Sequence, residues 1–106
     1  MGPIVIACYR PRAGKEHSLL QLVKEHVPTL RRQRLATERA ACVMRSADGT
    51  IVEVFEWCSP QAVERAHTDP VVQALWERFG AVCEFGQLGK LPEAQQMFAH
   101  FEPVDT

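Results

Sequence analysis

The segment from Ile51 to Trp57 constrains the fold more than any other part of the sequence, because both of its faces are apolar. Side chains alternate between the faces of an extended strand. One face carries Ile51, Phe55 and Trp57, the other carries Val52, Val54 and Cys58, and Glu53 and Glu56 interrupt each face once. A strand buried on both sides needs a packing layer on each side. A chain of 106 residues has little material for two layers, so we expect a second copy to supply one.

Two helix starts of the same kind follow this strand. Ser59-Pro60 and Asp69-Pro70 each place a capping side chain before a proline, which is favoured at the first position of a helix. The first helix is predicted to end near His67. The second carries a continuous apolar stripe at helical spacing, made of Val72, Leu75, Trp76, Phe79, Val82 and Cys83. Glycines at 86 and 89 then indicate a loop.

The remaining elements complete a β-α-β-β-α-β order, which is typical of a ferredoxin-like α+β fold with an antiparallel sheet. Asp48-Gly49 between two apolar runs is a strong signal for a β-hairpin. Pro28 predicts a kink or a restart in the first helix. The predicted elements are strand 3–9, helix 15–34, strands 40–45 and 50–57, the two helices above, and a last strand 97–104, forming one domain over residues 1–106.

Composition excludes several classes of partner. The net charge is -1, from 12 Lys and Arg against 13 Asp and Glu, so no overall field favours nucleic acid or an anionic membrane. No apolar run is long enough to span a bilayer, and the N-terminal residues lack the pattern of a secretory signal. We therefore expect a cytoplasmic protein whose four cysteines are buried and reduced. Without a Cys-x-x-Cys or His-x-x-x-His pair, no metal or cofactor is expected.

Three features together resemble a known family. They are the strand Ile4–Arg10 followed by Ala-Gly-Lys, the Phe55-Glu56-Trp57 strand end followed by Ser-Pro, and the break from Ala66 to Pro70. The chain resembles the antibiotic-biosynthesis-monooxygenase-like domains of the dimeric α+β barrel superfamily over residues 4–104. The resemblance implies a homodimer whose sheets face each other as a barrel, with a ligand cavity between sheet and helices in each subunit.

The function implied by this resemblance is cofactor-independent monooxygenation of a small aromatic or quinone-like substrate. A different class, a non-catalytic small-ligand-binding or stress-associated homodimer, stays open. Haem handling has less support. Haem-degrading relatives carry an Asn on the first strand and a haem-ligating His on the last helix, whereas this chain contains no Asn and offers Trp76 near the position of that His.

An oxygenase without a cofactor needs a base near neutrality in an apolar cavity. His67, at the break between two helices, and His100, beside Phe101, are the candidate bases. Each has a plainer interpretation, His67 as a helix-end residue and His100 as a hydrogen-bonded core or interface residue. His17 and His26 are predicted at the surface. The candidate walls of the substrate cavity are Tyr9, Trp57, Trp76 and Phe79.

One basic cluster is left over, at the end of the first predicted helix. It comprises Arg31, Arg32, Arg34 and Arg39. Arginines can bind an acidic ligand through paired hydrogen bonds. The sequence favours the other interpretation, a solvated helix end whose cations meet the negative end of the helix dipole.

Overall fold

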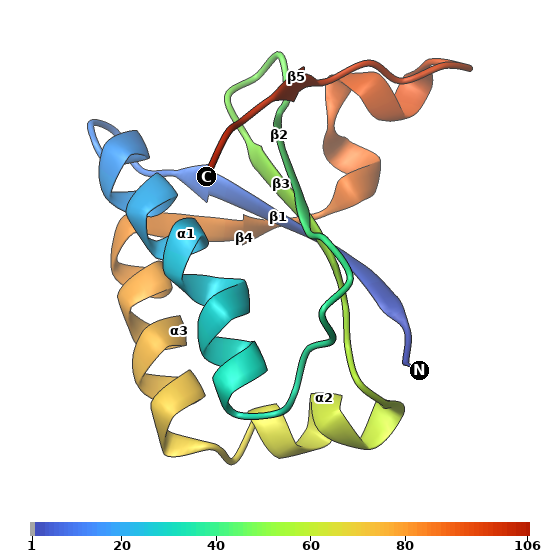
Figure 1. Cartoon of the computed structure of the whole chain (residues 1–106). Coiled ribbons are helices and arrows are strands. Elements are labelled where there is room, and N and C mark those ends of the chain that lie inside the picture. Colours follow the sequence, from blue (N-terminus) through green and yellow to red (C-terminus); the bar gives the residue numbers. More distant parts are fainter. Residues whose placement is uncertain (1) are drawn as a thin grey trace.

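The computed structural model describes residues 2–106 as an α+β unit with one open antiparallel sheet of five strands and three α-helices (Figure 1). The strand order is β4-β1-β3-β2-β5, which is compatible with the predicted ferredoxin-like arrangement. The elements in chain order are β1 (Ile4–Pro11), α1 (Glu16–Arg32), β2 (Cys42–Arg45), β3 (Ile51–Glu56), α2 (Pro60–Ala66), α3 (Pro70–Val82), β4 (Cys83–Gly86), the short 3₁₀ helices η1 (Leu88–Lys90) and η2 (Pro92–Gln95), and β5 (Glu102–Pro103).

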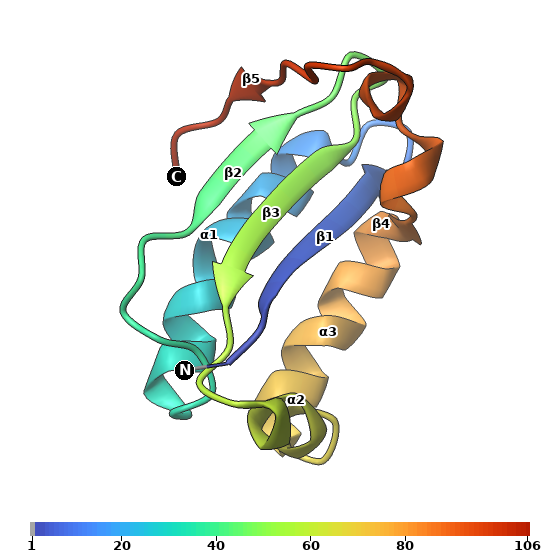
Figure 2. The same cartoon turned by 90° about the vertical axis from the view of Figure 1, so that its right-hand side faces the viewer.

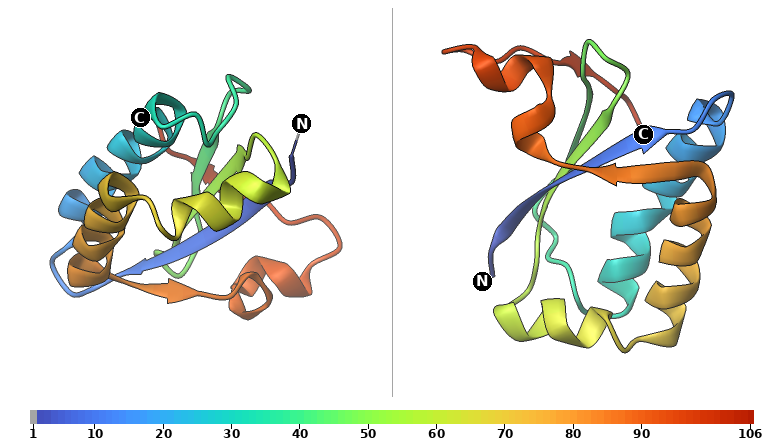
Figure 3. Two further views of the ribbon diagram at one scale, coloured as in Figure 1. Left: turned by 90° about the horizontal axis from the view of Figure 1, so that it is seen from below. Right: turned by 180° about the vertical axis from the view of Figure 1, so that it is seen from behind.

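Helices α1 and α3 lie side by side on one face of the sheet, and α2 crosses one end (Figure 3). Both predicted helix caps are confirmed. The Ser59 hydroxyl accepts a hydrogen bond from the Ala62 amide at 3.0 Å, and the Asp69 carboxylate accepts one from the Val71 amide at 2.9 Å. These caps satisfy backbone donors that have no partner inside a helix. They fix where α2 and α3 begin, and therefore which side of α3 faces the sheet.

Helix α1 continues through Pro28 as a single element, so the predicted restart does not occur. A proline in a helix leaves the carbonyl four residues earlier without its hydrogen bond. That carbonyl belongs to Lys24, and both Lys24 and Pro28 lie on the exposed side of α1. Water can satisfy it there, so the helix tolerates the proline.

The β2–β3 hairpin is closed by the predicted Asp-Gly turn. Gly49 has a φ of 92°, a region that favours glycine. The Thr50 amide donates to Asp48 Oδ1 at 2.9 Å, and this bond lowers the pKa of that carboxyl. The turn sets the hairpin register, in which Met44 pairs with Val52 and Val43 with Glu53.

The predicted last strand, residues 97–104, is wrong except for Glu102–Pro103, which pair with β2. The fourth strand of the ferredoxin-like core is β4 instead, at the place where the sequence predicts a helix end and a loop. Cys83 leaves α3 with extended backbone, and Phe85 then pairs with Tyr9 on the free edge of β1. Four residues ending in glycine give almost no alternation signal, so only the β1 edge determines this strand.

The face of the sheet opposite the helices is partly open. At one end, Cys8, Val52 and Leu91 form a buried cluster covered by the chain after η1. At the other end, Ile4 is 55% exposed and Ile6 is 47% exposed. Figure 2 looks onto this face, with α1 and α3 behind the sheet and the C-terminal segment across its upper end. The open face also carries Cys42, whose predicted burial is wrong.

Candidate functional site

An apolar cavity of about 340 Å³ lies on the helix-covered face of the sheet. Its residues come from β1, β3, β4, α1 and α3 and from Trp57 just after β3, so the packing of the helices on the sheet creates it. The lining residues are Val5, Ala7, Tyr9, His26, Phe55, Trp57, Trp76, Phe79 and Phe85. All four residues that the sequence suggested as cavity walls, Tyr9, Trp57, Trp76 and Phe79, line this one cavity.

A chain of hydrogen bonds runs through the wall of this cavity. The Tyr9 hydroxyl donates to Glu53 Oε1 at 2.7 Å. His26 Nδ1 lies 2.8 Å from the same oxygen, and the Trp76 indole Nε1 donates to His26 Nε2 at 3.0 Å. Glu53 has no exposed surface, and His26 is 3% exposed. Buried polar groups of this kind persist because they satisfy one another.

The order of donors assigns the tautomer of His26. An indole nitrogen can only donate, so His26 Nε2 accepts from Trp76 and carries no proton. The proton of the neutral ring therefore lies on Nδ1 and donates to Glu53. The other oxygen of this carboxyl, Oε2, has no hydrogen-bond partner among residues 2–106. Burial, together with the adjacent Glu53, raises the pKa of Tyr9 well above its ordinary value.

The strand and helix patterns explain how these groups meet. Glu53 alternates with the buried Ile51 and Phe55 on β3, so its side chain faces the helices. His26 lies four residues after Leu22 and four before Leu30, both buried, so it belongs to the buried stripe of α1. The predicted surface position of His26 is therefore wrong. A signal existed in the sequence: a carboxylate and an imidazole each occupy a core position, and buried charged groups require partners.

The two histidines suggested as bases lie elsewhere. His67 is exposed, its Nδ1 lies 2.9 Å from the Val63 carbonyl, and its ring meets the edge of Trp76 at 5.2 Å between centroids. His100 is exposed in the segment after η2. Neither lines the cavity. The imidazole that does is His26, whose ring is packed edge-on against Phe55 and Phe79.

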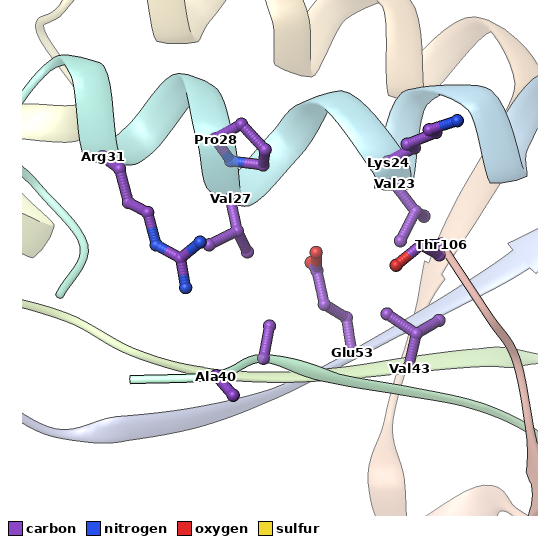
Figure 4. Close-up of a pocket in the computed structure, with 10 residues that line it drawn as sticks. Val23, Lys24, Val27, Pro28, Arg31, Ala40, Val43, Glu53 and Thr106 are labelled. Carbon is purple, nitrogen blue, oxygen red and sulfur yellow. The ribbon is translucent and has the colours of Figure 1, made fainter. Parts of the chain in front are cut away.

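A second cavity, of about 450 Å³, lies on the other side of Glu53. Figure 4 shows the Glu53 side chain rising from the sheet toward α1, between Val23 and Val27. Lys24 and Arg31 from α1 also line this cavity. Glu53 thus separates an apolar cavity from one with basic side chains. Only the apolar cavity brings aromatic walls and an imidazole together.

Arg31 and Arg39 of the basic cluster hold the chain that follows α1. Arg31 donates to the carbonyls of Thr37 and Arg39 at 2.8 and 2.9 Å. The guanidinium of Arg39 lies 3.2 Å from Glu56. A hydrogen bond from Thr37, and then Arg39, lowers the pKa of Glu56. The main contacts of these two arginines are thus within the chain.

Within residues 2–106, no group of three or more His, Cys, Asp or Glu side chains is arranged to hold a metal ion. None of the helices in this part of the chain is long and apolar enough to cross a membrane. Comparison of the chain with models of protein families, with curated proteins and with solved structures finds no match.

Proposed function

We propose that the chain binds a small aromatic or quinone-like ligand in the apolar cavity between its sheet and helices. The observation that carries this proposal is the lining of the cavity, which is aromatic and aliphatic except for the polar atoms of Tyr9, His26 and Trp76. Small-molecule sites combine such walls with a few fixed polar groups, and their volumes run from about 300 to 1,000 Å³. A volume of about 340 Å³ suits a ligand of a few fused rings.

Titration with 1-naphthol tests this proposal, because both tryptophans of the chain line the cavity and their fluorescence reports occupancy. We expect saturable quenching. Ala7→Leu fills the cavity from β1 and should weaken binding at least tenfold. Ala74→Leu makes the same change on the exposed side of α3 and should leave binding unchanged. Absence of saturable binding to the unaltered protein would overturn the proposal.

We further propose that the cavity supports cofactor-independent monooxygenation, with His26 as the base. The supporting observation is the pairing of His26 Nδ1 with Glu53, because a carboxylate behind an imidazole fixes its tautomer and stabilises the imidazolium that forms. A phenol that loses its proton to the imidazole can give electrons to O₂. One oxygen atom enters the ring and the other leaves as water, so that 1-naphthol and O₂ give a naphthoquinone and water.

Oxygen uptake tests this activity. We expect one O₂ consumed for each quinone formed, loss of turnover in His26→Gln, and unchanged turnover in His67→Gln and His100→Gln. These last two variants also test the sequence-based candidates directly. Binding of naphthol without oxygen uptake would leave a ligand-binding protein and remove the oxygenase.

We propose that the protein is a homodimer whose open sheet faces pack together as a barrel. The exposed Ile4 and Ile6, next to the half-buried Val54, support this, because contiguous exposed apolar surface indicates an interaction site. Sedimentation should give a dimer at micromolar concentration. Ile6→Asp should give a monomer, whereas Val71→Asp, at an exposed residue of α3, should stay dimeric. A monomeric unaltered protein would contradict the proposal.

A further inference from the structure

Within residues 2–106, His26 is the only histidine that lines the apolar cavity. Its unprotonated nitrogen, Nε2, already accepts a hydrogen bond from a side chain of the protein. The indole of Trp76 donates to it at 3.0 Å. The opposite side of the ring is fixed by Glu53 at 2.8 Å, and the ring makes T-shaped contacts with Phe55 and Phe79. His26 therefore cannot turn Nε2 away. A ligand can therefore donate a hydrogen bond to Nε2 only after the indole of Trp76 has left it.

Trp76 is the more exposed member of the pair. His26 is buried from all sides, whereas Trp76 is only partly buried and contacts the exposed His67 at a centroid distance of 5.2 Å. Although the indole also packs against the core residues of α1 and β3, it is the side chain that a ligand in the cavity must displace to reach His26 Nε2. Its movement would leave an unpaired acceptor in an apolar wall, which is costly unless another donor replaces the indole.

We infer that the indole N–H of Trp76 occupies the position that a ligand hydroxyl takes in the complex. The site then selects hydroxyarenes, whose O–H replaces the indole N–H as the donor to His26 Nε2. This inference rests on the proposed ligand cavity and specifies the class of ligand it accepts. The exchange is one hydrogen bond for another, so it costs little for a phenol. An aryl ether or a plain arene that displaces Trp76 leaves Nε2 without a donor. The bound phenol then has its proton directed at the imidazole.

The matched ligands 1-naphthol and 1-methoxynaphthalene test the inference, because they differ in the donor and share the ring system. We expect naphthol to bind about tenfold more tightly, as a buried hydrogen bond of ordinary strength predicts. In ¹⁵N-labelled protein the two tryptophans give two indole N–H signals, which Trp57→Phe assigns. The Trp76 signal should shift with naphthol, in the direction of a lost hydrogen bond.

The variant Trp76→Phe removes the competing donor and keeps an aromatic wall. Naphthol and the ether should then both bind several-fold more tightly than to the unaltered protein, because neither has to displace the indole, and naphthol should stay the preferred ligand. Trp57→Phe is the matched control, since Trp57 lines the same cavity and makes no hydrogen bond to His26. That variant should gain no affinity for either ligand.

The outcomes separate the inference from the cavity proposal. Equal binding of both ligands, with an unmoved Trp76 signal, would overturn the inference and leave the cavity as a ligand site. Binding of neither ligand would overturn both. The signal is measured in the unaltered protein, so the test stands even where Trp76→Phe fails to fold.

Discussion

The helix-covered face of the sheet and its open face both carry apolar side chains, but the chain covers the first more fully than the second. On the covered face, α1 and α3 pack over the sheet beside an apolar cavity and a four-residue polar network. On the open face, the segment after η1 covers one end and leaves Ile4 and Ile6 exposed at the other. The chain fixes the partners of the polar network on the covered face, whereas on the open face it leaves the apolar side chains of Ile4 and Ile6 exposed. We therefore propose chemistry for the first face and association for the second.

Glu93 of η2 holds the segment that covers one end of the open face. Its carboxylate accepts hydrogen bonds from the Ser46 hydroxyl at 2.7 Å and from the Ala47 amide at 2.8 Å. The amide bond and then the hydroxyl bond lower the pKa of Glu93. A few polar contacts thus hold a segment that has little regular structure. The helices, in contrast, are stabilised by capping side chains and by long rows of buried apolar residues.

The largest effect is expected at the centre of the covered face. Phe79 has no exposed surface and packs between Tyr9 and His26, at centroid distances of 5.0 and 5.2 Å. Phe79→Ala should lower the free energy of unfolding by about 3–5 kcal/mol, measured by urea denaturation. Phe85→Ala, at a ring of the same cavity that is 62% exposed, should cost less than about 1 kcal/mol. Equal losses would mean that the centre of the covered face is packed no more tightly than its edge.

The next effect concerns the covered end of the open face. Leu91 is 4% exposed and packs on Cys8 and Val52. Leu91→Ala should cost about 2–3 kcal/mol, toward the lower end for a buried leucine because the covering segment can partly collapse into the space. Leu88→Ala, three residues earlier and 43% exposed, is the control. A negligible loss at Leu91 would show that this segment does not cover the sheet.

A smaller effect is expected from the hydroxyl of Tyr9. Tyr9→Phe keeps the ring and removes one donor to Glu53, so it should cost about 1–2 kcal/mol at neutral pH. Tyr9 is the only tyrosine, so its phenolate absorbance reports one group. Its raised pKa means that the folded protein keeps the proton at a pH where the unfolded chain loses it, near 10.

The sign of the alkaline effect follows from this difference. Stability linked to Tyr9 is fully present below about pH 10 and is lost as the pH rises through the higher folded-state pKa. We expect the absorbance change of the native protein to lie well above that of the urea-unfolded protein, and to accompany unfolding. In Tyr9→Phe this part of the alkaline decline should vanish. A native titration near pH 10 would contradict the buried hydrogen bond.

Sequence reasoning recovers the elements whose signals are local. The Asp48-Gly49 turn, the Ser59 and Asp69 caps and the apolar stripe of α3 each predict their element from a few neighbouring residues. The strand β4 has no such signal, because only its pairing with β1 makes it a strand. The alternation of residues 97–101 is a misleading pattern, since Phe101 packs on the sheet while Met97 and Phe98 stay exposed.

The candidate site likewise has one part that the sequence predicts and one part that it does not. The walls Tyr9, Trp57, Trp76 and Phe79 follow from their aromatic character and their positions on predicted strands and helices. The partnership of His26 with Glu53 joins residues 27 positions apart, and no local pattern encodes it. Each residue alone resembles an ordinary polar interruption of an apolar face. Their pairing becomes evident only when α1 packs on β3 and brings the two polar side chains together.

The smallest effect is expected at the uncovered end of the open face, and it bears directly on the dimer. Ile6 is 47% exposed, so Ile6→Ala should change the stability of the dilute, monomeric chain by less than about 0.5 kcal/mol. Ile51→Ala, the same substitution at a residue with no exposed surface on the covered face, should cost about 2–5 kcal/mol. If the open faces pair, the Tm of the unaltered protein rises with concentration, and that of Ile6→Ala rises less, because association stabilises only the folded state. A loss at Ile6 that matches Ile51 at every concentration would mean that the chain itself buries this face.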